Sequence, residues 1–167
     1  MPAPIVVTAT FGDGDNGWLQ ALRQIHYPLE RNRVPAHLTL FHHLPPGAAD
    51  ELDLLLARVA RTPRPAARIA GILDLGGGTA FRVESAALEE AREAIARSLH
   101  GLLMPQDQAP WRPHVTIQNK VAPTAARALR AELKVGFAAR PLAISGLASW
   151  HYRDGPWEPI KRYPFRG

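Results

Sequence analysis

Hydrophobic and polar residues alternate along the N-terminal part of the chain in a way that predicts a strand followed by a helix. Residues 4–11 form an apolar run with several β-branched side chains, which is typical of a buried strand. Between 18 and 25, hydrophobic residues recur at intervals of three or four, which predicts an amphipathic helix. The segment 12–16, rich in glycine and aspartate, separates the two elements, and Pro28 ends the helix.

The same alternation of strands and helices continues to the C-terminus. We predict a strand between Pro35 and Pro45, helices over about 48–61, 85–102 and 123–135, and strands over about 66–75, 79–84, 112–121, 138–153 and 157–165. Gly76-Gly77-Gly78 lies between two short strands and is not followed by Lys-Ser or Lys-Thr, which indicates a hairpin turn rather than a phosphate-binding loop. The order of elements favours an α/β or α+β sandwich of two similar halves related by a pseudo-twofold axis.

A four-residue pattern of histidine, apolar residue, threonine and apolar residue occurs twice, at 37–40 and at 114–117. Successive side chains of a strand point to opposite faces, so the histidine and the threonine share one face. The polar face then carries His37 and Thr39 in one copy, and His114 and Thr116 in the other. Each copy predicts a strand whose apolar side packs on the core. Two such strands side by side would bring two imidazoles and two hydroxyls to one place.

The same alternation assigns five further residues to these polar faces. Phe41 and His43 share the face of His37, and Arg112, Gln118 and Lys120 share the face of His114. Phe41 could stack on a nucleobase, and Arg112 or Lys120 could neutralise a phosphate. A structural role remains an equal alternative for each of them. His42 has the opposite parity and is expected to point away from the site.

Composition narrows the class of protein. The chain has 167 residues and no cysteine, which excludes a disulfide framework, a thiol nucleophile and a thiolate metal site. We expect a single domain over residues 1–167, cytoplasmic and monomeric, with no membrane segment and no signal peptide. The net charge of +5 favours anionic ligands, although no run of basic residues indicates duplex binding.

Two histidines beside one phosphorus atom suit the opening of a cyclic phosphodiester. The reaction needs a base for the attacking water, an acid for the leaving oxygen and donors for the charge on the phosphate. Histidine serves as acid or base near neutral pH because its ordinary pKa is about 6.5. His37 and His114 could divide these roles, with Thr39 and Thr116 contacting the phosphate. This scheme needs no cofactor and no metal.

The paired motifs, about eighty residues apart, resemble those of the 2H phosphoesterase superfamily, which includes the bacterial 2′-5′ RNA ligase-like proteins and the RNA 2′,3′-cyclic phosphodiesterases. A proline before each motif and the hairpin at Gly155-Pro156-Trp157 add to the likeness. The resemblance implies an α+β fold: a bilobal pseudo-twofold sandwich of two βαβ-type lobes, with mostly antiparallel sheets facing a central groove. It also implies metal-independent conversion of 2′,3′-cyclic phosphodiesters to 2′-phosphomonoesters, with weak reversible 2′-5′ RNA ligase activity at most. His37 and His114 would be the acid/base pair, and Thr39 and Thr116 the phosphate-holding hydroxyls.

One departure from the family leaves the substrate open. Many members follow the first motif with a Phe-Leu-Gly-like stretch, whereas this chain has Phe-His-His-Leu-Pro-Pro at 41–46. RNA 2′,3′-cyclic ends, free cyclic nucleotides and small cyclic sugar phosphates all remain candidate substrates. The alternatives are a non-catalytic RNA- or nucleotide-binding module of the same fold and a metallohydrolase. The latter would use His37, His42, His43 and His114, but adjacent strand residues point to opposite faces and no HExxH motif is present.

Overall fold

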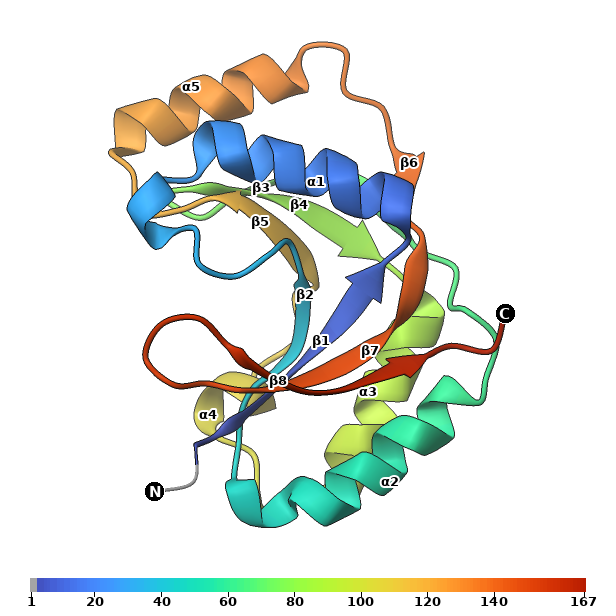
Figure 1. The fold of residues 1–167 in the computed structure, drawn as a ribbon. Coiled ribbons are helices and arrows are strands. Elements are labelled where there is room, and N and C mark those ends of the chain that lie inside the picture. Colours follow the sequence, from blue (N-terminus) through green and yellow to red (C-terminus); the bar gives the residue numbers. More distant parts are fainter. Residues whose placement is uncertain (1–2) are drawn as a thin grey trace.

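The computed structural model describes residues 3–167, which form two sheets and five helices (Figure 1). In chain order the elements are β1 (Ile5–Phe11), α1 (Asp13–His26), β2 (Leu38–Leu44), α2 (Ala49–Ala60), β3 (Arg68–Asp74), β4 (Thr79–Glu84), α3 (Ala86–Ser98), α4 (Pro105–Gln108), β5 (His114–Gln118), α5 (Pro123–Lys134), β6 (Arg140–Pro141), β7 (Ile144–His151) and β8 (Glu158–Pro164). Short 3₁₀ turns lie at Leu29–Arg31 and Pro46–Ala48.

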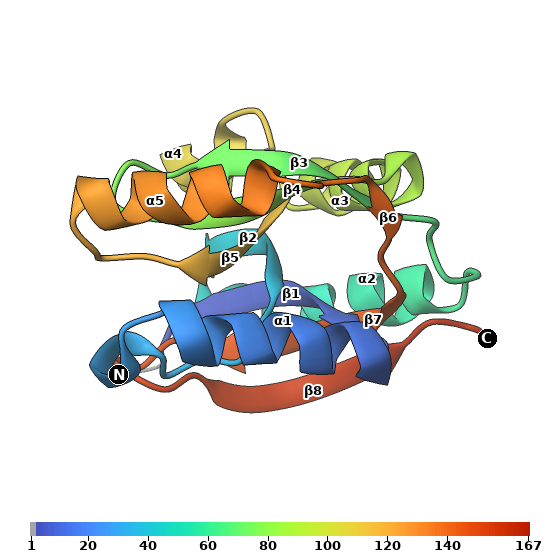
Figure 2. The same ribbon diagram turned by 90° about the horizontal axis from the view of Figure 1, so that it is seen from above.

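The strands form two four-stranded sheets with the orders β2-β1-β7-β8 and β5-β4-β3-β6. Every pair of named strands is antiparallel, which confirms the α+β class. The two motif strands, β2 and β5, are edge strands of different sheets and contact each other. Seen from above, they lie where the two sheets approach each other (Figure 2). The topology therefore brings together the two motifs that the sequence separates.

The two halves of the chain interlock. The order β1-α1-β2-α2 recurs as β4-α3-β5-α5, with the short helix α4 inserted before β5, which gives the predicted pseudo-twofold repeat. Each helix between the paired strands packs on the sheet of the other half: Trp18 of α1 stacks on Phe81 of β4 with ring centroids 5.3 Å apart. Similarly, Arg92 of α3 lies over the ring of Phe41 in β2, at 4.7 Å from its centroid. The two lobes are thus intertwined, because each sheet is covered by a helix from the other half.

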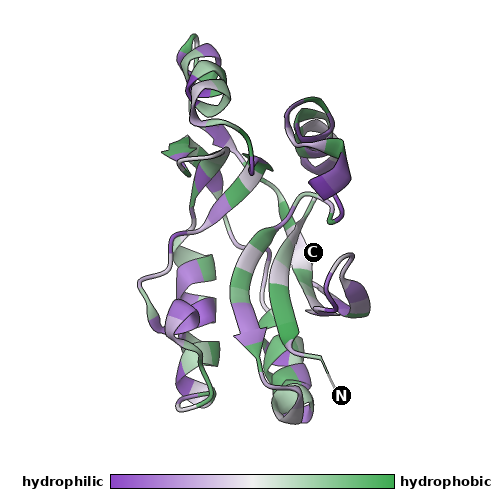
Figure 3. Cartoon of the chain, turned by 90° about the vertical axis from the view of Figure 1, so that its left-hand side faces the viewer, coloured by the Kyte–Doolittle hydropathy of each residue, from purple (hydrophilic) through white to green (hydrophobic). Residues whose placement is uncertain are grey.

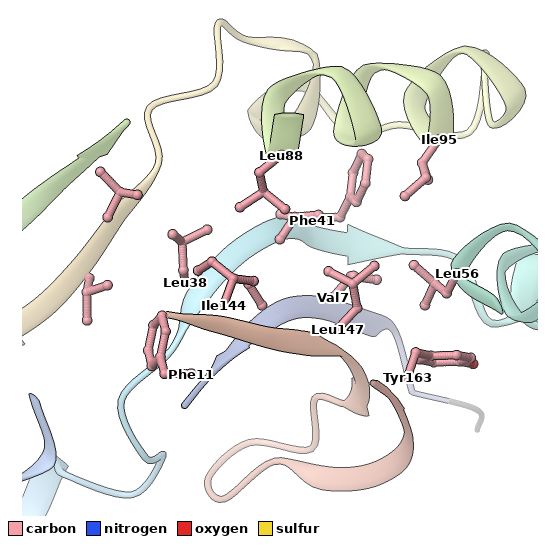
Figure 4. Packing of buried hydrophobic residues seen from close by; sticks show 14 of the residues in the cluster. Val7, Phe11, Leu38, Phe41, Leu56, Leu88, Ile95, Ile144, Leu147 and Tyr163 are labelled. Atoms are coloured by element: carbon pink, nitrogen blue, oxygen red, sulfur yellow. The ribbon is translucent and has the colours of Figure 1, made fainter. Parts of the chain in front are cut away.

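The apolar residues of both motifs face the core. Leu38, Leu40, Val115 and Ile117 are all completely buried, which confirms the predicted orientation of the two strands. Coloured by hydropathy, the central strands show long hydrophobic stretches, whereas hydrophobic and hydrophilic residues alternate along the helices (Figure 3). Buried side chains of β1, β2 and β7 meet those of α2 and α3 in one continuous cluster (Figure 4). Burial of this apolar surface is the main force that holds the sheets and helices together.

The alternation of side chains breaks at the same point after each motif. The register shifts by one residue between Thr39 and Phe41 in the pairing with β1, and between Thr116 and Gln118 in the pairing with β4. A bulge of this kind places the next residue on the opposite face. Phe41 is accordingly completely buried, beneath α3 with Leu88 (Figure 4). The prediction that Phe41 faces a ligand is therefore wrong.

Gln118 is the counterpart of Phe41 in the second motif strand. Its side chain is only 5% exposed and accepts a hydrogen bond from the hydroxyl of Thr79 at 3.1 Å. Thr79 in turn lies under Ala126 of α5. The prediction of a ligand-binding role for Gln118 is wrong for the same reason, because the bulge at Ile117 turns the side chain toward the helix.

The pairing of β2 with β1 has a second register shift, between Phe41 and Leu44, and a buried carboxylate binds the backbone there. Asp107, on the short helix α4, accepts hydrogen bonds from the backbone N–H groups of His42 and His43 at 2.9–3.0 Å. Its Oδ1 also lies 3.1 Å from Nδ1 of His42. Burial alone would raise the pKa of Asp107, but these hydrogen bonds outweigh it and lower the pKa below its ordinary value. The sequence predicted only a loop for this segment.

Two further elements differ from the predicted boundaries. Helix α1 begins at Asp13, within the glycine- and aspartate-rich segment that was expected to be a loop. Negative charges on Asp13 and Asp15 favour the N-terminal turn of a helix, and Asp15 also accepts the backbone N–H of Ala143 at 2.8 Å. The predicted strand 138–153 is divided into β6 and β7, which belong to different sheets.

We predict that Val115→Asp prevents stable folding. Val115 is completely buried opposite Phe81, so the variant would bury an unpaired charge and lose at least about 3 kcal/mol of the free energy of unfolding. Val115→Ala is the control, with an expected loss of roughly 2 kcal/mol. Urea unfolding followed by circular dichroism measures both. A stable, active Val115→Asp protein would contradict the orientation of β5.

We also predict that Asp107→Ala destabilises the protein by about 2–4 kcal/mol at pH 7, because it leaves two backbone N–H groups without an acceptor. Asp107→Asn keeps one acceptor and should lose less. The lowered pKa means that the carboxylate stabilises the fold above the ordinary pKa of aspartate, and that this contribution disappears as the pH falls through the folded-state value. Urea midpoints at pH 7 and pH 3 should therefore differ less in Asp107→Ala than in the wild type. Equal midpoints for wild type and Asp107→Ala at pH 7 would count against the role of Asp107.

Candidate active site

The two motif histidines have the same hydrogen-bonded setting. Nδ1 of His37 lies 2.8 Å from the carbonyl oxygen of Pro35, and Nδ1 of His114 lies 2.6 Å from that of Arg112. A carbonyl oxygen only accepts hydrogen bonds, so Nδ1 carries the proton in both rings. Nε2 of each half-buried ring is then left to exchange a proton with a ligand. The carbonyl two residues before each histidine thus fixes its tautomer.

Electrostatics distinguishes His37 from an ordinary histidine. Burial of the imidazole lowers the pKa of His37 to about 4, against the opposing effect of its hydrogen bond to Pro35. The charge of Arg23, and those of His114 and His42 when protonated, act in the same direction as burial. His37 is therefore neutral at pH 7.

Thr39 and Thr116 lie on the same faces as their histidines, and both are half-buried. Neither hydroxyl makes a hydrogen bond to another residue within the described range 3–167, so both can donate to a ligand. Their backbone carbonyls, by contrast, are held firmly. Trp111 Nε1 donates to the carbonyl of Thr39 at 3.0 Å, and Arg23 donates to the carbonyl of Thr116 at 2.8 Å. Each motif is therefore fixed by a side chain that comes from the other half of the chain.

Arg23 is a buried residue of the candidate site that the sequence analysis missed. It is only 2% exposed, lies on α1 and also donates to the carbonyl of Val34 at 2.8 Å, three residues before His37. Its guanidinium stands over the ring of Tyr27, 4.3 Å from the centroid. The buried guanidinium of Arg23 thus links the segment before the first motif to the second motif strand. The available signal was an arginine four residues after Leu19, on the apolar side of the predicted helix.

Arg92 has the corresponding position in α3. Its Nε donates to the carbonyl of Leu40 at 2.8 Å, and another nitrogen donates to the carbonyl of Asp107 at 2.9 Å. The first of these carbonyls belongs to the bulge after the first motif. Arg92 therefore satisfies a backbone group that the irregular pairing of β2 leaves open.

Three other predicted site residues, Lys120, His43 and Arg112, are exposed and lie apart from the histidine pair. Lys120 follows the end of β5 with a φ of 60°, and His43 is exposed near the end of β2. Arg112 lines a separate hollow with Arg82 and Glu84. Their binding roles stay predictions. Among residues 3–167, no three side chains of histidine, cysteine, aspartate or glutamate are arranged to hold a metal ion, so the histidine cluster of the metallohydrolase alternative is not assembled.

His37 borders a hollow that extends over the first sheet. The ring of Trp157, on the hairpin between β7 and β8, lies 4.7 Å from that of His37 between centroids and is tilted by 56°. Trp157 and His37 both line this hollow, whose volume is about 430 Å³. In the part of the chain from residue 3 onward, no helix has the length and apolar character needed to cross a membrane.

Comparisons with solved structures show the same fold. The E. coli LigT structure complexed with 3′-AMP has a TM-score of 0.64 and 15% sequence identity, with 100% of both chains covered. TT0787 of Thermus thermophilus has a TM-score of 0.63 and 16% identity, with 98% of each chain covered. A structure described as a phosphoesterase has a TM-score of 0.60 and 17% identity, covering 99% of this chain and 100% of that one. At these identities the likeness establishes the fold alone.

Sequence comparison gives the family. A search of curated proteins finds no significant match. The family model of the 2′-5′ RNA ligase superfamily, however, matches residues 11–156, a range that includes both motifs. The interlocked sheets and the paired His-apolar-Thr-apolar strands agree with this match. Because the match covers most of the chain, the protein belongs to the 2′-5′ RNA ligase superfamily.

Proposed function

We propose that the protein is a phosphoesterase that opens 2′,3′-cyclic phosphodiesters to 2′-phosphomonoesters by acid/base catalysis at His37 and His114, without a metal. The observation that carries the proposal is the matched pair of imidazoles, each with Nδ1 bonded to a carbonyl, on two edge strands that contact each other. Support comes from E. coli LigT, a protein of the same fold whose structures include complexes with 3′-AMP, NADP+, ATP and phosphate.

We assign the role of base to His37 and that of acid to His114, because the lowered pKa of His37 keeps it neutral at pH 7. A neutral His37 accepts a proton from water through Nε2, and the water oxygen forms a bond to phosphorus. The bond from phosphorus to O3′ breaks, and O3′ takes a proton from Nε2 of a protonated His114. The product is the 2′-phosphomonoester, with the proton balance restored when His37 passes its proton to solvent and His114 regains one.

Charge on the phosphate increases during this step and needs donors. The free hydroxyls of Thr39 and Thr116 can donate to the two non-bridging oxygens. The buried guanidinium of Arg23 contributes a fixed positive charge beside them, because it binds the backbone of the second motif. Its position also disfavours protonation of His37, which keeps the base in its active form.

Hydrolysis of a 2′,3′-cyclic nucleotide in excess chelator tests the proposal. We expect the wild type to give the 2′-phosphate, identified by phosphorus NMR, and His37→Ala and His114→Ala each to lower kcat by about 10²–10⁴-fold while remaining folded. His100→Ala is the matched control, since His100 is exposed beyond α3, and it should keep full activity. Binding of the nucleotide without turnover by the wild type would favour a non-catalytic binding module. Loss of wild-type activity in chelator would favour metal-dependent chemistry.

The pH dependence tests the assignment of the base. Because His37 must be neutral to accept a proton, kcat/KM should be lost only as the pH falls through about 4. At pH 5.5 the acidic limb should still be close to its plateau. A base with the ordinary histidine pKa would be only about 10% deprotonated there. A half-maximum near pH 6.5 on the acidic side would show that His37 is not the base.

A further inference from the structure

The hollow beside His37 is a trough along one face of the first sheet. It is lined by Thr8, Thr10 and Ser145 on the strands, Trp150 and Trp157 near His37, and Arg64 and Arg162, with Asp13 of α1 also on its wall. Its volume of about 430 Å³ is in the range of small-molecule binding sites. Nothing in the acid/base chemistry of the histidine pair uses these residues.

One end of the trough is aromatic. Trp157 is half-buried, with ring centroids 4.7 Å from His37 and 6.2 Å from Trp150. Trp150 is fixed by a hydrogen bond of 3.0 Å from its Nε1 to the hydroxyl of Thr8. An indole held directly beside a catalytic imidazole is suited to stack on a nucleobase whose ribose carries the reacting phosphate.

The opposite end of the trough is cationic. Trp157 precedes the first residue of β8, whereas Arg162 lies in its second half. Arg64 lies still further along, because the adjacent Pro63 forms a bridge with Arg166 beyond the end of β8. Ser145 and Trp150, five positions apart on β7, both line the trough, so it is on the order of 15 Å long.

The two arginines are available for a ligand. Both are exposed, and within residues 3–167 neither forms a salt bridge or a side-chain hydrogen bond. Other arginines of the same sheets are paired: Arg68 and Arg82 with Glu84, and Arg140 with Asp15. The two arginines carry two positive charges and Asp13 carries one negative charge. The side chains that line the trough therefore have a net charge of +1 while His37 is neutral. An unpaired guanidinium pair is suited to bind phosphate.

We infer that this trough is a second subsite, in which Trp157 binds the base of a cyclic nucleotide and Arg64 and Arg162 bind a second phosphate of the same substrate. The inference rests on the proposed opening of a cyclic phosphodiester at His37 and His114. It names the substrate class as a cyclic nucleotide that carries a further phosphate. That phosphate is either a terminal 5′-phosphate or the next phosphodiester of a strand, and both have the same chemistry at the arginines.

The test compares three substrates that share one base: a 2′,3′-cyclic nucleotide with a 5′-hydroxyl, the same nucleotide with a 5′-phosphate, and a dinucleotide with a 2′,3′-cyclic end. We expect the wild type to favour one of the two phosphate-bearing substrates by tenfold or more in kcat/KM. The favoured one identifies the source of the phosphate. Arg64→Ala/Arg162→Ala should remove this preference by lowering kcat/KM for the favoured phosphate-bearing substrate tenfold or more.

The matched control removes two arginines on the other side of Trp157. Arg31 and Arg33 line a neighbouring hollow that also contains Trp157. Arg31→Ala/Arg33→Ala has the same change of charge and should keep the preference. The inference would be overturned if the wild type showed no preference, or if Arg64→Ala/Arg162→Ala kept it. It would also be overturned if Arg31→Ala/Arg33→Ala lost the preference instead.

Failure of the proposed reaction can be separated from failure of the subsite. If no cyclic substrate is turned over, calorimetry still compares the binding of adenosine 3′,5′-bisphosphate with that of 3′-AMP. The wild type should bind the bisphosphate at least tenfold more tightly, and Arg64→Ala/Arg162→Ala should bind both equally. Trp157→Ala should weaken both ligands, whereas Trp157→Phe should restore much of the binding. Equal affinity of the wild type for the two ligands would contradict the second phosphate subsite.

Discussion

The site depends on the contact between two edge strands that belong to different sheets. Strands β2 and β5 share no sheet, so no ladder of backbone hydrogen bonds fixes their relative position. Side chains take over this role: Arg23 holds the carbonyl of Thr116, and Trp111 holds the carbonyl of Thr39. Because each of these groups comes from the opposite half of the chain, the two imidazoles are placed by the interlocking of the halves.

The buried cation has a second effect on the chemistry. Arg23 is surrounded by carbonyl oxygens and an aromatic ring rather than by a carboxylate, so its charge is not neutralised locally. That charge favours a neutral His37, in the same direction as burial. Arg23 therefore supports the backbone of the second motif and adds to the effect of burial on the protonation state of His37.

The predictions from the sequence failed where the strands stop being regular. Alternation correctly placed the apolar residues Leu38 and Val115 in the core. It failed two residues after each threonine, at Phe41 and Gln118, because a bulge reverses the faces in both strands. Periodicity assumes a constant repeat of two, and an inserted residue is invisible to it. That both failures occur at the same point of the repeat shows that the bulge belongs to the repeated unit.

By itself, the sequence determined the secondary-structure class, the apolar faces of the motif strands and the chemical identity of the four groups that the motifs carry. These depend on local periodicity and residue type, which need no knowledge of distant contacts. Only the tertiary structure decided that α1 and α3 each pack on the sheet of the other half. It also decided that Asp107 stabilises the irregular end of β2 and that Arg23 lies beside His37. It also decided the neutral state of His37 and the trough between Trp157 and Arg64. The reason is physical: burial, mutual charge and shape arise from residues far apart in the chain, and only the folded molecule brings them within reach of each other.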